Sequence, residues 1–390
     1  MSTTASTAPI RLAFSESDRI LEKSSTTSEA TTPTSARPSS ISISSYYDLN
    51  TVIVKICQIL TNTTNTTTTN TTTNTATITP RTFRIALQVP IPNLNDAQPL
   101  INLLTSRMST AHPSLHFHSF ILGDSGCCPD LVGARHLDAD VLVQVGTSCV
   151  SEFQGMPLIR APGRMPMDVS RLAEGVRGRG LEGVEGLVVL LDPSYEHHGA
   201  EVASALPEFN VVVCEAGAEA DDPDNAGAPC PPVHSRAPLG GFIVPPSASP
   251  DSPCIYVGPA GKRLDQILLP RPDVLHFDPA SGELMECEGK GIKRRFYLAN
   301  AIKRAFTIGI LVTSQTPSTR SRITRLESIL ASSGRSSYLV AVGKPKAEKV
   351  LNFSEVEAWV VVGCGWGRML DLGLHCPMVT EWELEVGLGL

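Results

Sequence analysis

The chain has 390 residues, of which 42% are hydrophobic and 5% aromatic, and its formal charge is −7. This length predicts about two or three domains, and the acidic balance argues against a nucleic-acid-binding protein, which usually has a basic domain. No segment approaches the roughly eighteen apolar residues of a membrane-spanning helix, and the N-terminus lacks the apolar stretch of a secretory signal peptide. We therefore expect a cytoplasmic protein.

The N-terminal part alternates between low-complexity segments and a predicted helix. Residues 1–45 are rich in serine and threonine, a composition typical of disorder, although FSESDRILEK (14–23) has the pattern of a short docking helix. The segment YYDLNTVIVKICQIL, which starts at Tyr46, predicts an amphipathic helix. A threonine- and asparagine-rich tract at 61–79 follows, and we expect it to be a flexible insertion.

Strands and helices alternate through the rest of the chain. The predicted strands are 83–89, 115–122, 141–145, 156–159, 187–191, 209–214, 254–257, 274–277, 308–312, 337–342 and 359–362. Such alternation predicts an α/β protein with mostly parallel sheets. We expect three similar βαβ-type domains around a central site, at 46–167, at 168–293 with a proline-, glycine- and alanine-rich insertion at 215–250, and at 294–390.

Cysteines follow three of the predicted strands. In FILGDSGCCPDLVGARHLDADVLVQVGTSCV (120–150), Cys127 and Cys128 come after the first strand and Cys149 after the second. Cys364 has the same setting after the strand 359–362. Ligands of open α/β sheets bind at the carboxyl edge of the strands, so these thiols are candidates for one binding site.

The chemistry of this candidate site depends on the spacing of the cysteines. A chain with ten cysteines and no export signal belongs in a reducing compartment, and we expect Cys57, Cys214 and Cys254 to be small core residues. Three thiols without a CxxC pair fit neither structural zinc nor a dithiol redox centre. They fit an iron–sulfur cluster with one open iron, but from spacing alone three unrelated strand-end cysteines remain the simpler interpretation.

Several segments in the same order resemble the family that begins diphthamide synthesis, the 2-(3-amino-3-carboxypropyl)histidine synthases. They are residues 120–149, GMPLIRAPGRMPMDV (155–169), IYVGPAGKRLDQILL (255–269), GKGIKRRFYLANAIKRAFTIGILVTS (289–314), YLVAVGKPKAEKVLNF (338–353), WVVVGC (359–364) and CPMVTEWELEV (376–386). Within the family the chain resembles the eukaryotic second-subunit branch, because the middle domain shows no convincing counterpart of the ligand that first subunits carry there.

The resemblance implies an accessory role in a heterodimer. In such enzymes the cluster of the partner, subunit 1, cleaves S-adenosylmethionine at its Cγ–S bond, and a 3-amino-3-carboxypropyl radical adds to a histidine of elongation factor 2. This chain is expected to hold a [4Fe-4S] cluster through Cys128, Cys149 and Cys364, with Cys127 as the alternative to Cys128. It would pass electrons from a donor protein to the partner's cluster and contribute no catalytic residue itself.

Departures from the family pattern keep two alternatives open. The loop before the cysteine pair is shortened to Asp124-Ser125-Gly126, and family members generally continue beyond EWELEVGLGL. His375 and Cys376 are weaker candidates for additional ligands. The alternatives are a cluster-free structural partner subunit and a self-sufficient homodimeric transferase that binds S-adenosylmethionine itself.

Overall fold

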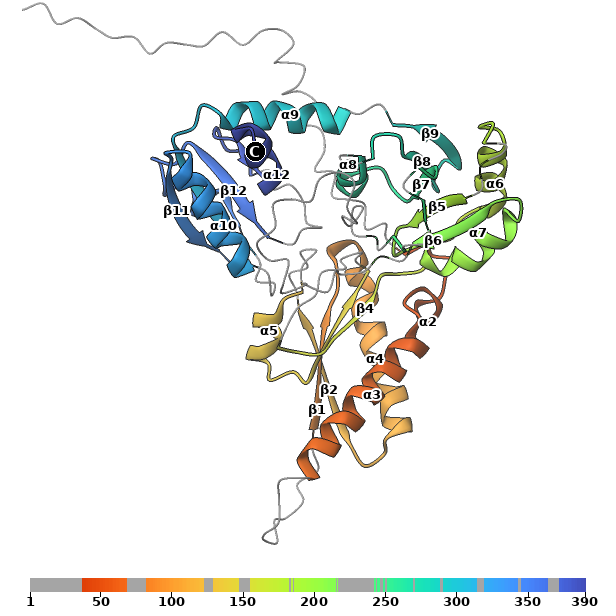
Figure 1. The fold of residues 1–390 in the computed structure, drawn as a ribbon. Coiled ribbons are helices and arrows are strands. Elements are labelled where there is room, and N and C mark those ends of the chain that lie inside the picture. Colours follow the sequence, from red (N-terminus) through yellow and green to blue (C-terminus); the bar gives the residue numbers. More distant parts are fainter. Residues whose placement is uncertain are drawn as a thin grey trace, which may run out of the picture.

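The protein is built from three β-sheets, each with its own helices (Figure 1). The computed structural model describes residues 37–68, 82–122, 129–146, 155–181, 184, 186–214, 216, 242, 244–245, 248–249, 251–268, 271–287, 290–313, 319–342, 345–363 and 372–390. Neighbouring strands pair in parallel in all three sheets, except for one antiparallel pair at the edge of the second. The predicted α/β class with mostly parallel sheets is confirmed.

The first sheet has the strand order β2-β1-β3-β4. Its strands are β1 (Thr82–Gln88), β2 (His116–Leu122), β3 (Val141–Val145) and β4 (Leu158–Ala161). The helical elements of this unit are α2 (Ile43–Tyr46), α3 (Leu49–Thr68), η1 (Ile91–Asp96), α4 (Ala97–Ala111) and α5 (Leu131–His136). Helices α3 and α4 bury one face of the sheet in a large apolar cluster, and the shorter α5 covers the other face with a smaller one.

The first unit is ordered over a longer stretch than the sequence indicates. The Arg37 guanidinium donates two hydrogen bonds to the Asp96 carboxylate, from Nε at 2.8 Å and from Nη2 at 2.9 Å. Ile41 and Ile43 pack on the core. Ile41 and Ile43 are a local sign of packing within the serine-rich stretch, but the average composition of residues 1–45 hides them. Helix α3 also continues to Thr68, into the tract expected to be a flexible insertion.

The second sheet has the order β6-β5-β7-β8-β9. Its strands are β5 (Gly186–Leu191), β6 (Asn210–Cys214), β7 (Cys254–Val257), β8 (Leu275–Asp278) and β9 (Glu283–Glu286), with α6 (Val169–Arg177), η2 (Glu196–His198), α7 (Gly199–Ala205) and α8 (Lys262–Leu268) around them. Helix α6 was not predicted from the sequence, although Asp168 is a regular N-cap whose side chain accepts from the amides of Ser170 and Arg171.

The third sheet has the order β11-β10-β12-β13. Its elements are α9 (Lys290–Ile302), β10 (Thr307–Val312), α10 (Thr319–Ser332), β11 (Ser336–Ala341), α11 (Ala347–Val350), β12 (Ala358–Val362), β13 (Met378–Val379) and α12 (Glu381–Leu388). Gly309 on β10 pairs with Trp359 on β12. A Cβ atom on Gly309 would lie 2.3 Å from the indole Cε3, so the buried tryptophan occupies the space that only a glycine leaves open.

Three arginine–glutamate pairs hold the last helix, α12, against the third unit. Its three glutamates face α9 and α10, and the pairs are Arg295 with Glu383, Arg322 with Glu381, and Arg325 with Glu385. Glu383 is fully buried and also closes a capping box with Thr380. A buried carboxylate needs such compensation, because an unpaired one would be strongly destabilising.

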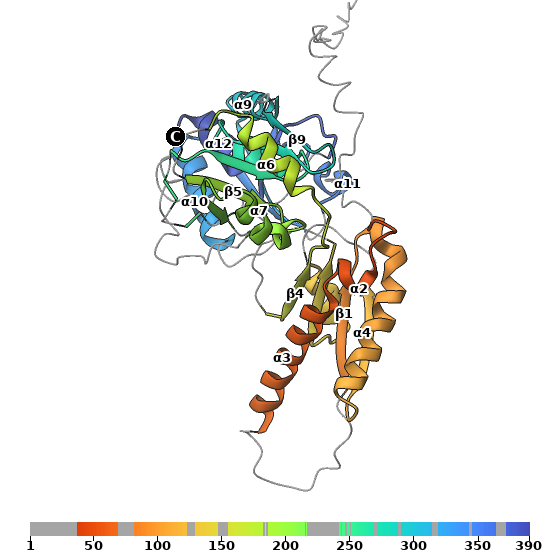
Figure 2. The same cartoon turned by 90° about the vertical axis from the view of Figure 1, so that its right-hand side faces the viewer.

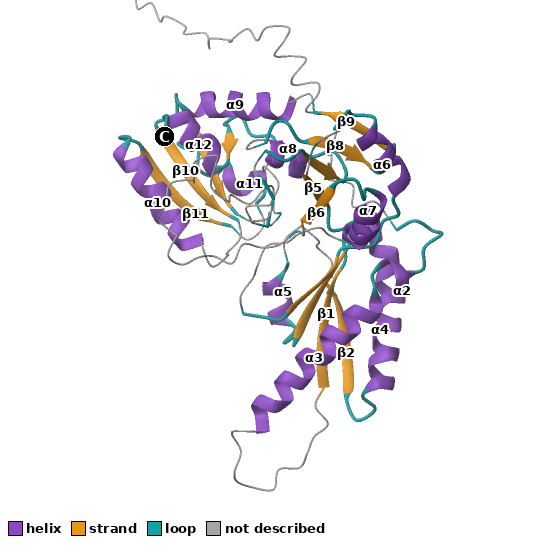
Figure 3. Ribbon diagram, turned by 45° about the vertical axis from the view of Figure 1, so that its right-hand side comes forward, coloured by secondary structure: helices purple, strands orange, loops and turns teal. Residues whose placement is uncertain are grey.

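The three units surround a common centre. In Figures 1 and 3 the carboxyl ends of the first sheet and of β12 face the same central region, and Figure 2 shows the first unit extending away from the other two. The first and second units touch where the amide of Met165 donates to Ser194 O at 2.9 Å. Within the described residues, no helix is long and apolar enough to cross a lipid bilayer.

Candidate functional site

The predicted cluster ligands lie outside the described residues. Cys127 and Cys128 fall in 123–128, Cys149 in 147–154 and Cys364 in 364–371. The described chain ends beside each of these segments, so the geometry of the site is given by the strands that lead into them and by the side chains that hold those strands.

All three segments begin at the carboxyl end of a parallel strand. Strands β2 and β3 pair with β1 on its two sides, and β12 lies between β10 and β13 in the third sheet. The two sheet edges face the same central region (Figure 1). Three chain segments that are remote in sequence therefore start toward the middle of the molecule, at the type of sheet edge that binds ligands in α/β proteins.

The chain that leaves the cysteine pair is tied to β1. The Asp130 amide donates to Gln88 Oε1 at 2.9 Å, and the Gln88 side chain is buried at the end of β1. Asp130 in turn accepts from the Gly133 amide at 2.9 Å and so caps α5. The backbone two residues after Cys128 is therefore anchored both to the sheet and to a helix.

The chain that leads to Cys149 leaves β3 through a constrained glycine. Gly146 has a φ of +65°, a conformation that favours glycine, and its amide donates to Ala161 O at 2.8 Å. A Cβ atom on Gly146 would lie 2.6 Å from Asn93 Nδ2 and 2.9 Å from Pro90 Cγ. The loop after β1 thus packs directly on the backbone that leads to this cysteine.

The chain that leads to Cys364 is fixed by a neighbouring strand end and an arginine. The Thr313 amide donates to Val362 O at 2.9 Å, and Arg322 Nη1 donates to Gly363 O at 2.7 Å. Arg322 itself is ion-paired with Glu381. Arg322 was not predicted as a site residue, because its partners lie some forty and sixty residues away along the chain.

A polar cluster lies at the carboxyl ends of β5 and β7 in the second sheet. Asp192, directly after β5, is 5% exposed and accepts from Arg263 Nη1 at 2.9 Å and from the Tyr256 hydroxyl at 3.4 Å. Burial raises the pKa of Tyr256 well above its usual value, so the phenol remains a neutral donor. His276 completes this edge with Nε2 2.8 Å from Gly258 O.

Burial raises the thiol pKa of Cys214, Cys254 and Cys376. Burial raises the pKa of Cys214 to about 11 and that of Cys254 to about 12, so both thiols stay protonated, and their prediction as core residues is confirmed. Burial also raises the pKa of Cys376, which packs near Trp359. Across the described ranges, no group of three or more His, Cys, Asp or Glu side chains is arranged to hold a metal ion.

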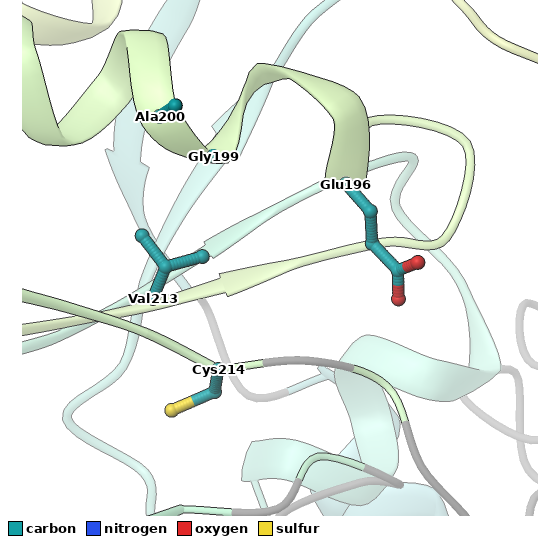
Figure 4. A pocket seen from close by; sticks show the side chains of 5 residues that line it. All are labelled: Glu196, Gly199, Ala200, Val213 and Cys214. Atoms are coloured by element: carbon teal, nitrogen blue, oxygen red, sulfur yellow. The ribbon is translucent and has the colours of Figure 1, made fainter.

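A pocket of about 380 Å³ lies in the second unit, between α7 and the end of β6 (Figure 4). It is lined by Glu196, Gly199, Ala200, Val213 and Cys214. The Glu196 carboxylate accepts from the Ala216 amide at 3.1 Å, and in Figure 4 the Cys214 sulfur points away from it. Burial thus favours the neutral thiol of Cys214, and the Glu196 carboxylate is engaged by a backbone amide.

The fold and the three strand ends define an α/β protein of three units, each with a mostly parallel sheet, arranged around a common centre. The sequence profile of the family described as "Putative diphthamide synthesis protein" matches residues 93–390. The chain therefore belongs to the family of diphthamide synthesis proteins, which confirms the resemblance drawn from the sequence.

Individual relatives agree with this assignment. The chain is 31% identical over 323 residues to subunit 2 of the 2-(3-amino-3-carboxypropyl)histidine synthase of Gallus gallus, covering 78% of this chain and 64% of that protein. It is 30% identical to the Xenopus laevis subunit 2 and 25% identical to that of Schizosaccharomyces pombe, again over 78% of this chain and over 63% and 61% of theirs. The chain thus spans less than two thirds of the length of these relatives.

Solved structures with the same fold come from Pyrococcus horikoshii. Dph2 of that organism superimposes with a TM-score of 0.58 at 21% identity, covering 79% of this chain and 86% of that one. The structure of the same protein with a 4Fe-4S cluster gives a TM-score of 0.60 at 21% identity, with 79% and 87% coverage. At this identity the likeness establishes the fold.

Proposed function

We propose that this protein is the accessory iron–sulfur subunit of the heterodimeric synthase that carries out the first step of diphthamide biosynthesis. In this role it supports the transfer of a 3-amino-3-carboxypropyl group from S-adenosylmethionine to a histidine of elongation factor 2. The partner, subunit 1, binds S-adenosylmethionine and performs the transfer. The bound [4Fe-4S] cluster of this chain supplies electrons that keep the partner's cluster reduced, and the complex works in the reducing environment of the cytoplasm.

The observation that carries the proposal is the common orientation of the strand ends that lead to the predicted ligands. Strands β2, β3 and β12 direct their carboxyl ends toward one central region (Figure 1). A cluster with three cysteine ligands from distant parts of a chain requires this convergence. The relatives named as subunit 2 and the fold shared with a protein that binds a 4Fe-4S cluster support the same assignment.

The residues proposed to hold the cluster are Cys128, Cys149 and Cys364, with Cys127 as the alternative to Cys128. The donor set fits an iron–sulfur cluster, because thiolates are its usual ligands. The anchored flanks also fit, since Gln88, Gly146 and Arg322 hold the backbone next to the three ligand segments. The second unit agrees with an accessory role, because the position directly after β5 is occupied by Asp192, which is ion-paired with Arg263.

The test is anaerobic purification of the full chain, followed by measurement of iron, acid-labile sulfide and the broad visible absorbance of a cluster. We expect a cluster in the wild-type chain and its loss in Cys149→Ser, with Cys57→Ser as the matched control that keeps it. Comparing Cys127→Ser with Cys128→Ser identifies the third ligand as the variant that loses iron. A wild-type chain that binds zinc, or no metal, contradicts the proposal.

The accessory role is tested separately by activity. Elongation factor 2 should be modified when this chain, subunit 1, S-adenosylmethionine and a reductant are combined. Modification by this chain alone would instead favour a self-sufficient homodimer. Full activity of the complex with serine at Cys128, Cys149 and Cys364 would favour a cluster-free structural partner.

A further inference from the structure

The end of β12 is held by a side chain from another element. Arg322, on α10, donates from Nη1 to Gly363 O at 2.7 Å, and its Nε donates to Glu381 Oε1 at 2.8 Å. A further bond from Nη2 reaches the same carboxylate oxygen. Glu381 is the first residue of α12, where the positive end of the helix dipole also favours a negative charge. A single guanidinium therefore connects the end of β12 with two helices.

The oxygen that Arg322 contacts belongs to a particular peptide unit. A peptide unit is planar, and the unit that contains Gly363 O also contains the backbone nitrogen of residue 364. A hydrogen bond to this oxygen therefore constrains the plane through which the chain enters Cys364. The preceding carbonyl, of Val362, is held by the Thr313 amide at 2.9 Å, so two successive carbonyls at the strand end are fixed.

We infer that Arg322 is a positioning residue, which, together with Glu381, orients the entry of Cys364 into the cluster site and sets the charge beside it. This inference rests on the proposed function. The side chains of Arg322 and Glu381 are 25% and 18% exposed, so solvent and salt screen their charges less than those of surface residues. Residues that do not bind a metal themselves but orient one of its ligands typically affect how tightly the metal is held.

The two charges should act on a bound cluster in opposite directions. Reduction adds negative charge to a cluster, so a nearby guanidinium favours the reduced form and a nearby carboxylate disfavours it. Loss of the Arg322 charge should therefore shift the reduction potential to more negative values, and loss of the Glu381 charge to more positive values. A purely structural role for the pair predicts no such opposite shifts.

The same two helices provide a matched control. Arg325 lies one turn further along α10 and pairs with Glu385 on α12, at 2.8 Å. The exposed fractions of this second pair, 27% and 10%, are close to those of the first. Among the described contacts, Arg325 bonds to Glu385 and not to the end of β12. Truncation of Arg325 therefore removes a comparable helix–helix link without releasing Gly363.

The experiment compares Arg322→Met, Arg322→Lys, Glu381→Gln and Arg325→Met in the full chain, reconstituted anaerobically with iron and sulfide. The readouts are thermal unfolding, the rate of iron loss to a chelator and the reduction potential. We expect Arg322→Met to lose iron about 10-fold faster than the wild type, and Arg325→Met to retain iron like the wild type. Arg322→Lys should restore the potential but not the slow iron release, because lysine lacks the fork that reaches both partners.

Two results would overturn the inference in distinguishable ways. Equal iron loss in Arg322→Met and Arg325→Met, with unshifted potentials in Arg322→Met and Glu381→Gln, contradicts the role of Arg322 and leaves the proposed function intact. A wild-type chain that takes up no cluster contradicts both. If Arg322→Met does not fold, Arg322→Lys and Glu381→Gln carry the same comparison, because both keep a polar group at the pair.

Discussion

The first and third sheets differ from the second in what lies at their carboxyl edges. At the ends of β3 and β12 the chain continues through Gly146 and Gly363 into the segments with the predicted ligands. At the same edge of the second sheet, the buried side chains of Asp192 and Tyr256 and the largely buried side chain of Arg263 form a polar cluster. Among the described residues, the second unit thus has an ion pair at the carboxyl end of β5, whereas β3 and β12 lead toward predicted ligands, and this difference agrees with the proposal of a site built from two of the units.

The strongest test of this comparison is the loss of a cysteine from each kind of sheet edge. Cys364→Ser should abolish the cluster, because oxygen is a poor substitute for a thiolate ligand. Cys214→Ser, at the end of β6 in the second sheet, should leave iron and sulfide content unchanged, because the raised pKa of Cys214 keeps that thiol protonated. Iron content per folded chain measures both, and loss of iron in Cys214→Ser would break the comparison.

The next largest effect concerns the helix that completes the third unit. Arg295→Met leaves Glu383, which is fully buried, without its cationic partner, and we expect a loss of about 3–5 kcal/mol of stability. Chemical denaturation followed by circular dichroism measures the change. Lys303→Met, at an exposed position just after α9, is the control and should have little effect; a small effect of Arg295→Met would contradict the importance of this pair.

In the second unit, Asp192→Asn should be destabilising without affecting a cluster. The substitution removes the charge that compensates the largely buried Arg263, which we expect to cost about 2–3 kcal/mol. Chemical denaturation measures the stability, and iron analysis measures the cluster content. Asp251→Asn, at an exposed position, is the control. Faster iron loss at unchanged stability would indicate that the second unit contributes to the site after all.

The smallest expected effect is pH-dependent and lies in the first unit. Hydrogen bonds from Arg37 and Tyr47 lower the pKa of Asp96 below its ordinary value of 3.8. A carboxylate with a lowered pKa stabilises the fold above that ordinary value, and the contribution is lost as the pH falls further. Asp96→Asn should therefore cost about 1–2 kcal/mol at neutral pH and progressively less below pH 4, as followed by denaturation across pH. A pH-independent cost would contradict this origin.

The sequence predicted the elements whose signal is local. Buried strands such as β7, Cys254–Val257, have continuous apolar runs, and their bounds were predicted closely. The hairpin strand β9 and the short helix α12 were missed although both have local signals, the turn at 279–282 between β8 and β9 and the capping box of Thr380 and Glu383. The two-residue β13, in contrast, is defined by its pairing with β12. The same limit applies to the site. Strand-end cysteines are visible in the sequence, but the arginine that holds Gly363 is recognised only when α10 and β12 are brought together.

The contact between Gly309 and Trp359 restricts the order in which mutations can accumulate at the two positions. Any side chain at 309 would overlap the indole ring, so Gly309→Ala is expected to be tolerated only after Trp359 has become smaller. A smaller residue at 359 alone leaves a cavity, which costs stability but does not prevent folding. Mutational paths through this pair therefore run in one direction, and a double-mutant library should recover alanine at 309 only together with a reduced side chain at 359.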